Sequence, residues 1–100
     1  MGLEYAIDQL YATGWPAGEA LGCSSATDGR RYPTLDRVVR EFADSGFAFS
    51  MKRLELFDCH RAEWTDAGGR PVGAVVGHTP EEAAVFALAR HRMALSAVGL

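Results

Sequence analysis

Apolar residues at the start of the chain recur every three or four positions, which is the spacing of one face of an α-helix. They are Leu3, Ala6, Ile7, Leu10 and Tyr11. Gly14 and Pro16 end this pattern, because a residue before proline avoids the helical conformation. Residues 14–33 then show no period and are rich in glycine, serine and proline, so we expect a long irregular loop there.

A second helix is predicted where the same spacing returns. Its apolar positions are Leu35, Val38, Val39, Phe42 and Ala43. Thr34 suits the N-cap position, and Gly46 can take the left-handed conformation that ends a helix.

Alternating apolar and polar residues, the pattern of half-buried β-strands, follow this helix. The expected buried faces are Phe47, Phe49 and Met51 in a first strand, His60, Ala62 and Trp64 in a second, and Val72, Ala74 and Val76 in a third. Leu54 and Leu56 change the parity of the first strand, which predicts a bulge or a short turn near Lys52-Arg53. Pro71 belongs at a strand start or at a sheet edge, because it cannot donate a ladder hydrogen bond.

The last helix has a complete start signal, with Thr79 as the N-cap, Pro80 at the first position and Glu82 three residues after the cap. It is apolar on two sides as far as about residue 97, and such a helix is normally covered twice. We expect the sheet on one side and either an earlier helix or a second subunit on the other.

The element order is therefore α–loop–α–β–β–β–α. We predict one domain over residues 1–100 with an α+β fold, in which helices pack on a three-stranded antiparallel meander. The expected large core residues are Phe42, Trp64, Phe86 and Leu88.

Composition narrows the class of protein. Hydrophobic residues make up 48% and charged residues 23% of the chain, which is typical of a globular domain. The net charge of −3 gives no overall attraction to nucleic acid or to an anionic membrane. The N-terminus has no signal-peptide pattern and no apolar run is long enough to span a membrane, so we expect a cytoplasmic protein without a membrane partner. All basic residues except Lys52 are arginine, which indicates a high-GC, bacterial genome.

Candidate binding residues fall into two groups of arginine and aromatic side chains, which are common interface anchors. The first group borders the long loop and consists of Trp15, Arg30, Arg31 and Tyr32. The second group lies on the predicted sheet and consists of Lys52, Arg53, Arg61 and Arg70. Trp15 is favoured as a core residue that closes the first helix. The basic residues are favoured as ordinary surface charge, which nearby carboxylates offset.

Cys59, His60 and His78 are the residues around which an enzyme or a metal site could be built. No cysteine or histidine pair has the usual zinc spacing, and adjacent residues of a strand point to opposite faces. No glycine-rich loop runs from a strand into a helix, as a phosphate-binding loop would. We therefore expect no catalytic residue, no metal and no cofactor.

The β–β–β–α order of residues 47–97, with the helix before it, resembles the αβββα double-stranded-RNA-binding domain. The string from Glu82 to Ala89 resembles the alanine-rich start of that family's last helix. The family holds phosphates with a basic cluster at this helix start, whereas this chain has Pro80, Glu81 and Glu82 there. The resemblance therefore implies the topology and speaks against RNA binding.

The chain also resembles small phage-type ABA sandwich domains of unknown function, which implies no activity. The residues that carry this likeness are Trp64, Gly77, Thr79, Glu82-Ala83-Ala84 and Ala87-Leu88.

From these observations we expect a small non-catalytic module that binds a protein partner or a second copy of itself as a homodimer. A nucleic-acid-binding accessory domain that uses Lys52, Arg53, Arg61 and Arg70 is the alternative. A Cys/His enzyme or metal protein is the third reading.

Overall fold

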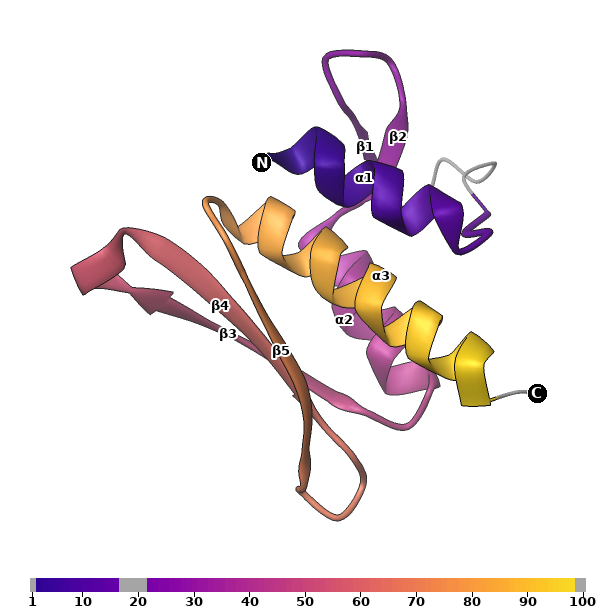
Figure 1. The fold of residues 1–100 in the computed structure, drawn as a ribbon, viewed down its shortest axis with the longest axis vertical. Coiled ribbons are helices and arrows are strands. Elements are labelled where there is room, and N and C mark those ends of the chain that lie inside the picture. The colour runs from indigo at the N-terminus through magenta and orange to yellow at the C-terminus, as the bar shows by residue number, and fades with distance from the viewer. Residues whose placement is uncertain (1, 17–21, 99–100) are drawn as a thin grey trace.

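The computed structural model describes residues 2–16 and 22–98. In this part of the chain, helices and strands follow the order α–β–β–α–β–β–β–α, so the predicted α+β class with a three-stranded meander is confirmed (Figure 1). The helices are α1 (Leu3–Ala12), α2 (Leu35–Asp44) and α3 (Pro80–Val98). The strands are β1 (Cys23–Ser25), β2 (Arg31–Pro33), β3 (Ala48–Leu54), β4 (Cys59–Thr65) and β5 (Pro71–Gly77).

Helix α3 is the centre of the packing. It contacts β4 and β5 on one side and α1 on the other, and α2 packs beside it against β3 (Figure 1). The buried side chains of α3 are therefore found all round its first half: Ala83, Ala84, Val85, Ala87, Leu88 and Ala89. Because α1 supplies the second cover, the apolar character of this helix does not call for a second subunit.

The predicted irregular loop over residues 14–33 is wrong in its second half. Strands β1 and β2 pair antiparallel there, from Cys23–Pro33 to Ser25–Arg31. Asp28 and Gly29, two of the residues taken as loop signals, lie in the turn of this hairpin, where Gly29 has a φ of 87°, whereas Ser24 and Ser25 belong to β1. Residues 17–21 of the predicted loop lie outside the described part of the chain.

Helix ends follow the predicted signals. The Thr34 hydroxyl accepts a hydrogen bond from the Arg37 amide at 3.3 Å, and the Thr79 hydroxyl accepts one from the Glu82 amide at 3.1 Å. After α2, Gly46 takes the left-handed conformation with a φ of 87°. The predicted starts of α2 and α3 and the predicted stop of α2 are therefore confirmed.

Of the two causes predicted for the change of parity near Lys52-Arg53, the bulge is wrong, and a short turn follows directly after β3. Strand β3 pairs with β4 in unbroken register along its whole length. The parity changes at Leu56 because this residue lies in η1, a short 3₁₀ helix (Glu55–Phe57) that joins the two strands. The register shift of the sheet lies instead between β4 and β5, at Trp64/Thr65.

The face predicted to be buried on β5 is also wrong. Val72, Ala74 and Val76 are exposed, whereas Val75 and Gly77 are buried. Strand β5 therefore turns its larger aliphatic side chains mainly away from α3.

Two close contacts made by glycine residues explain which face of β5 is buried. A Cβ at Gly73 would lie 2.9 Å from Cη2 of Trp64 and closer still to two other atoms of the same indole. A Cβ at Gly77 would lie 2.6 Å from the backbone nitrogen of Ala83 in α3. Only glycine leaves enough room at these inward positions, so a hydrophobicity pattern cannot identify them as the buried face.

Of the predicted large core residues, Phe42, Trp64 and Leu88 are buried, and Phe86 is half-buried. The Phe86 ring lies at the border of the core, where its centroid is 6.0 Å from that of Tyr5. The core lies between the sheet and the helices, which leaves the outer face of the sheet as the surface opposite to it (Figure 1).

Candidate functional site

The outer face of the three-stranded sheet, opposite to α2 and α3, combines exposed aliphatic and charged side chains. Val72 and Val76 of β5 are each 49% exposed. The adjacent positions of β4 on this face are Arg61, which pairs with Val76, and Glu63, which pairs with Ala74. A solvated sheet face is normally polar, so two exposed valines on it mark a candidate interface.

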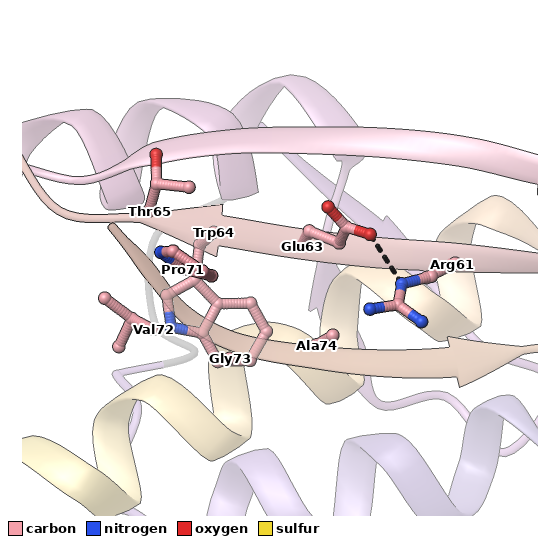
Figure 2. Close-up of a pocket in the computed structure, with 8 residues that line it drawn as sticks. All are labelled: Arg61, Glu63, Trp64, Thr65, Pro71, Val72, Gly73 and Ala74. Carbon is pink, nitrogen blue, oxygen red and sulfur yellow. Dashed lines mark hydrogen bonds and ion pairs between the residues drawn. The ribbon is translucent and has the colours of Figure 1, made fainter. Parts of the chain in front are cut away.

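A shallow hollow of about 270 Å³ lies on this face, between the ends of β4 and β5 (Figure 2). Figure 2 shows Arg61 and Glu63 side by side, joined by an ion pair of 2.5 Å. The Trp64 indole reaches across β5 beside Gly73 and helps to line the hollow. Aliphatic side chains complete the wall, so the hollow can accept an apolar group beside a fixed pair of charges.

The tip of the β3–β4 hairpin carries the most exposed apolar side chains of the described residues. Leu56 is 88% exposed and Phe57 is 72% exposed. Figure 1 shows this hairpin extending away from the helices, so that the tip lies at one end of the molecule. The two side chains are therefore free to enter a partner.

Two local contacts support the conformation of this tip, one of them an ion pair between exposed side chains. Asp58 adopts the left-handed region with a φ of 48°, an uncommon conformation for a residue with a side chain. Its backbone amide donates to the Glu55 carbonyl at 3.3 Å, and its carboxylate pairs with Arg53 at 3.3 Å. The exposed Leu56 and Phe57 are thus presented by an ordered turn.

The four basic residues predicted for the sheet do not form one patch. Lys52 and Arg61 lie directly opposite each other on β3 and β4, on the outer face. Arg53 has the opposite parity and pairs with Asp58 at the hairpin tip. Arg70 lies in the turn between β4 and β5, at the other end of the hairpins.

Trp15 is a core residue, as the favoured interpretation predicted. It is buried, and its indole nitrogen donates to Glu41 Oε2 at 3.1 Å. The Arg37 guanidinium lies 5.7 Å from the centroid of its ring and also binds Glu41. Trp15 therefore joins the end of α1 to α2 and is not available to a ligand.

Arg30, Arg31 and Tyr32 attach the β1–β2 hairpin to α1. The Arg30 guanidinium forms ion pairs with Asp8 and Asp28, and this interaction holds the pKa of Asp28 below its ordinary value. The Arg31 carbonyl accepts a hydrogen bond from the Tyr11 hydroxyl at 2.5 Å. Tyr32 is half-buried against the core. The loop group thus has structural contacts and lies apart from the sheet group.

Cys59, His60 and His78 are brought to one corner of the sheet, because His60 pairs with Gly77. Within residues 2–16 and 22–98, however, no group of three or more His, Cys, Asp or Glu side chains could hold a metal ion. Cys23 lies far from this corner in sequence and fold, on β1, where its sulfur accepts from Arg37 at 4.0 Å.

Sequence reasoning missed the hairpin tip. Leu56 and Phe57 are apolar, and an apolar residue next to a strand is normally assigned to the core. The signal that could have identified the tip is the string Glu55-Leu56-Phe57-Asp58, in which two acidic residues bracket two apolar ones.

No helix of the described residues is both long enough and apolar enough to cross a membrane. No family model matches the chain, and neither a curated protein nor a solved structure is significantly similar to it.

Proposed function

We propose that this chain is a small non-catalytic protein-interaction module, whose binding surface consists of the β3–β4 hairpin tip and the adjoining outer face of the sheet. The single observation that carries the proposal is the presentation of Leu56 and Phe57, 88% and 72% exposed, on an ordered turn. Exposed apolar anchors on a preorganised element are typical of binding surfaces, since little ordering entropy is lost on association.

The free energies of side-chain burial and of association favour a binding surface larger than the hairpin tip. Full burial of a leucine or a phenylalanine side chain contributes about 1.5–3 kcal/mol each. Association of two proteins costs an estimated 4–15 kcal/mol in lost translational and rotational freedom. Together Leu56 and Phe57 contribute about 3–6 kcal/mol, which reaches only the lower end of this cost. The partner therefore also contacts the outer face, where Val76 and the hollow beside Arg61 offer further apolar contact.

The proposal includes a cytoplasmic location and a bacterial source, and both rest on the sequence arguments alone. The partner is a protein with an apolar pocket that receives the Leu56–Phe57 tip.

The test compares affinity capture by three forms of the protein from the cells in which it is made. The forms are the wild type, a Leu56→Ser/Phe57→Ser variant and a Val39→Ser/Leu95→Ser control, in which exposed apolar residues of α2 and α3 change instead. We expect a protein that the wild type and the control retain and that the tip variant loses. Its purified form then binds the tip variant at least about tenfold more weakly than the wild type. Identical retention by all three forms would refute the proposal.

A nucleic-acid-binding accessory domain is the second candidate, and the pairing of Lys52 with Arg61 on the outer face favours it. Arg61 already pairs with Glu63, and Glu81 and Glu82 lie at the start of α3, so the electrostatic support is weak. Titration with labelled RNA duplex and single-stranded DNA at low salt separates the two candidates. Binding that weakens with salt and is lost in Lys52→Glu would select nucleic acid; the absence of binding would retain the protein partner.

The third hypothesis, a Cys/His enzyme or metal protein built on Cys59, His60 and His78, stays a prediction. Unchanged behaviour of a Cys59→Ser/His78→Ala variant in any activity found for the protein would exclude it.

A further inference from the structure

Strand β5 is an edge strand without charged residues. Within residues 2–16 and 22–98 the sheet order is β3-β4-β5, so β3 and β5 each have one edge that no other described strand pairs with. Strand β3 carries Lys52 and Arg53 and packs against α2. The seven residues of β5, Pro71–Gly77, include no charge, and Figure 1 shows this strand on the side nearest the viewer, with nothing drawn in front of it. Natural proteins usually protect such edges with lysine, proline, a bulge or a covering segment.

The protection on β5 is confined to its first two residues. Pro71 cannot donate a hydrogen bond, and Val72 is an extra residue between the Trp64–Gly73 and Thr65–Pro71 pairs. From residue 73 to residue 77 the register with β4 is regular. These five residues therefore retain the open backbone groups of a strand that can pair once more.

Space for added side chains exists on both faces of β5. The outer hollow of about 270 Å³ and an inner hollow of about 200 Å³ both lie along Val72, Gly73 and Ala74. The inner hollow extends to Arg90 and Ala94 of α3. A strand added at this edge would place alternate side chains along both hollows.

The charges at the two ends of β5 are opposite. Arg70 directly precedes the strand, in a turn that carries Asp66 on its β4 side, and Glu81 follows the strand in the first turn of α3. If a second copy of β5 runs antiparallel to the first, the basic end of each strand lies at the acidic end of the other. The strand is thus complementary to itself in charge. When Val75 lies at the centre of the antiparallel pairing, Ala74 of one copy lies beside Val76 of the other, in the uncharged middle of the strand.

We propose that the chain forms a symmetric homodimer in which β5 of one copy pairs antiparallel with β5 of a second copy over residues 73–77. The two three-stranded sheets then form one continuous sheet, and the interface closes on itself through a two-fold axis. This pairing rests on the β5 edge, and the proposed function rests on the Leu56–Phe57 tip. The two share the outer hollow, so variants at Ala74 and at Leu56/Phe57 are needed to test them separately.

The test exploits two positions that face the same carboxylate. Ala74 of β5 and Ser50 of β3 both lie opposite Glu63, on either side of β4. A lysine at either position lies beside Glu63 on the outer face, and only Ala74→Lys adds a charge at the β5 edge. Sedimentation equilibrium of the full chain should give a dimer for the wild type and for Ser50→Lys. Ala74→Lys should raise the dissociation constant at least about tenfold.

Charge exchange tests the antiparallel arrangement. Arg70→Glu and Glu81→Arg should each weaken the dimer, and the Arg70→Glu/Glu81→Arg double variant should restore it. Circular dichroism verifies that each variant is folded. Slowed hydrogen exchange of the residue 73–77 amides at high protein concentration provides an independent readout in the wild type. A wild-type monomer at every soluble concentration, or a dimer that Ala74→Lys and Ser50→Lys affect equally, would overturn the proposal.

Discussion

The imidazole of His91 lies tilted against the ring of Phe42, with 4.7 Å between centroids and 31° between planes. Phe47 contacts the same imidazole edge-on, also at 4.7 Å. His91 is buried, and within the described residues its Nε2 has no hydrogen-bond partner. A histidine held between two aromatic rings in this way favours the neutral form, because a buried positive charge there would have no partner.

Stability should therefore fall in mild acid. Burial, together with the nearby Arg92 charge, lowers the pKa of His91 below its ordinary value of 6.5. The unfolded chain then binds a proton more readily than the folded chain, so stability is highest above about pH 6.5 and decreases as the pH falls below that value. Urea unfolding measured between pH 8 and pH 5 checks this expectation.

Two variants isolate the contribution of His91. His91→Phe should flatten the pH dependence, whereas His78→Gln, a change at an exposed histidine, should leave it intact. An undiminished acid sensitivity in His91→Phe would contradict the assignment.

A second prediction concerns the glycine beneath the Trp64 indole. Gly73→Ala forces the new methyl group against the ring and should destabilise the fold by about 1–3 kcal/mol, the usual cost of overpacking a core. Gly68→Ala is the matched control, because its Cβ would meet only the Asp66 carboxylate, at an ordinary distance of 3.4 Å. Thermal unfolding of both variants measures the difference, and an equal small effect would show that Trp64 can move aside.

A third prediction concerns the contact between the end of α1 and α2. Trp15→Ala removes a buried indole and should cost about 3–5 kcal/mol of stability. Trp15→Phe keeps most of the packing and loses only the hydrogen bond to Glu41, so it should cost about 1–3 kcal/mol. Chemical unfolding of both variants gives the comparison. A loss in Trp15→Phe as large as in Trp15→Ala would show that the hydrogen bond outweighs the packing.

A fourth prediction separates structural from exposed arginines. Arg30 anchors the β1–β2 hairpin to α1 through Asp8, so Arg30→Ala should speed hydrogen exchange in residues 23–33. Arg70→Ala, in the turn beyond β4, should leave exchange in that hairpin unchanged. Equal exchange in both variants would indicate that the ion pairs of Arg30 contribute nothing measurable, as many surface pairs do.

The fold was predictable where local signals and global packing agree. Thr34, Thr79 and Gly46 mark helix ends through hydrogen bonds and backbone conformations that depend on the residue alone. Trp64 was assigned to the correct face because its neighbours in β4 alternate cleanly. In β5, Gly73 and Gly77 occupy inward positions. The tertiary contacts with Trp64 and Ala83 therefore determine which face of the strand is buried, and no hydrophobic periodicity could have shown it.

The candidate surface was harder to predict than the fold. Exposure of Leu56 and Phe57 follows from the turn that Asp58 and Arg53 form, which is a three-dimensional arrangement. The basic residues were identified as candidates from their type, yet the structure distributes them over two faces and two ends of the sheet. Residue type alone therefore suggested one basic patch. The alternation of side chains along the strands places these residues on different faces of the sheet.

The most direct test of the binding surface is photo-crosslinking at the hairpin tip. A photoreactive phenylalanine analogue replaces Phe57 in one form of the protein and Leu95 of α3, also exposed, in another. After irradiation of the living cells, the proposal predicts one discrete crosslinked species of higher mass from position 57 and none from position 95. Equal crosslinking from both positions, or none from position 57, would contradict a binding function of the tip.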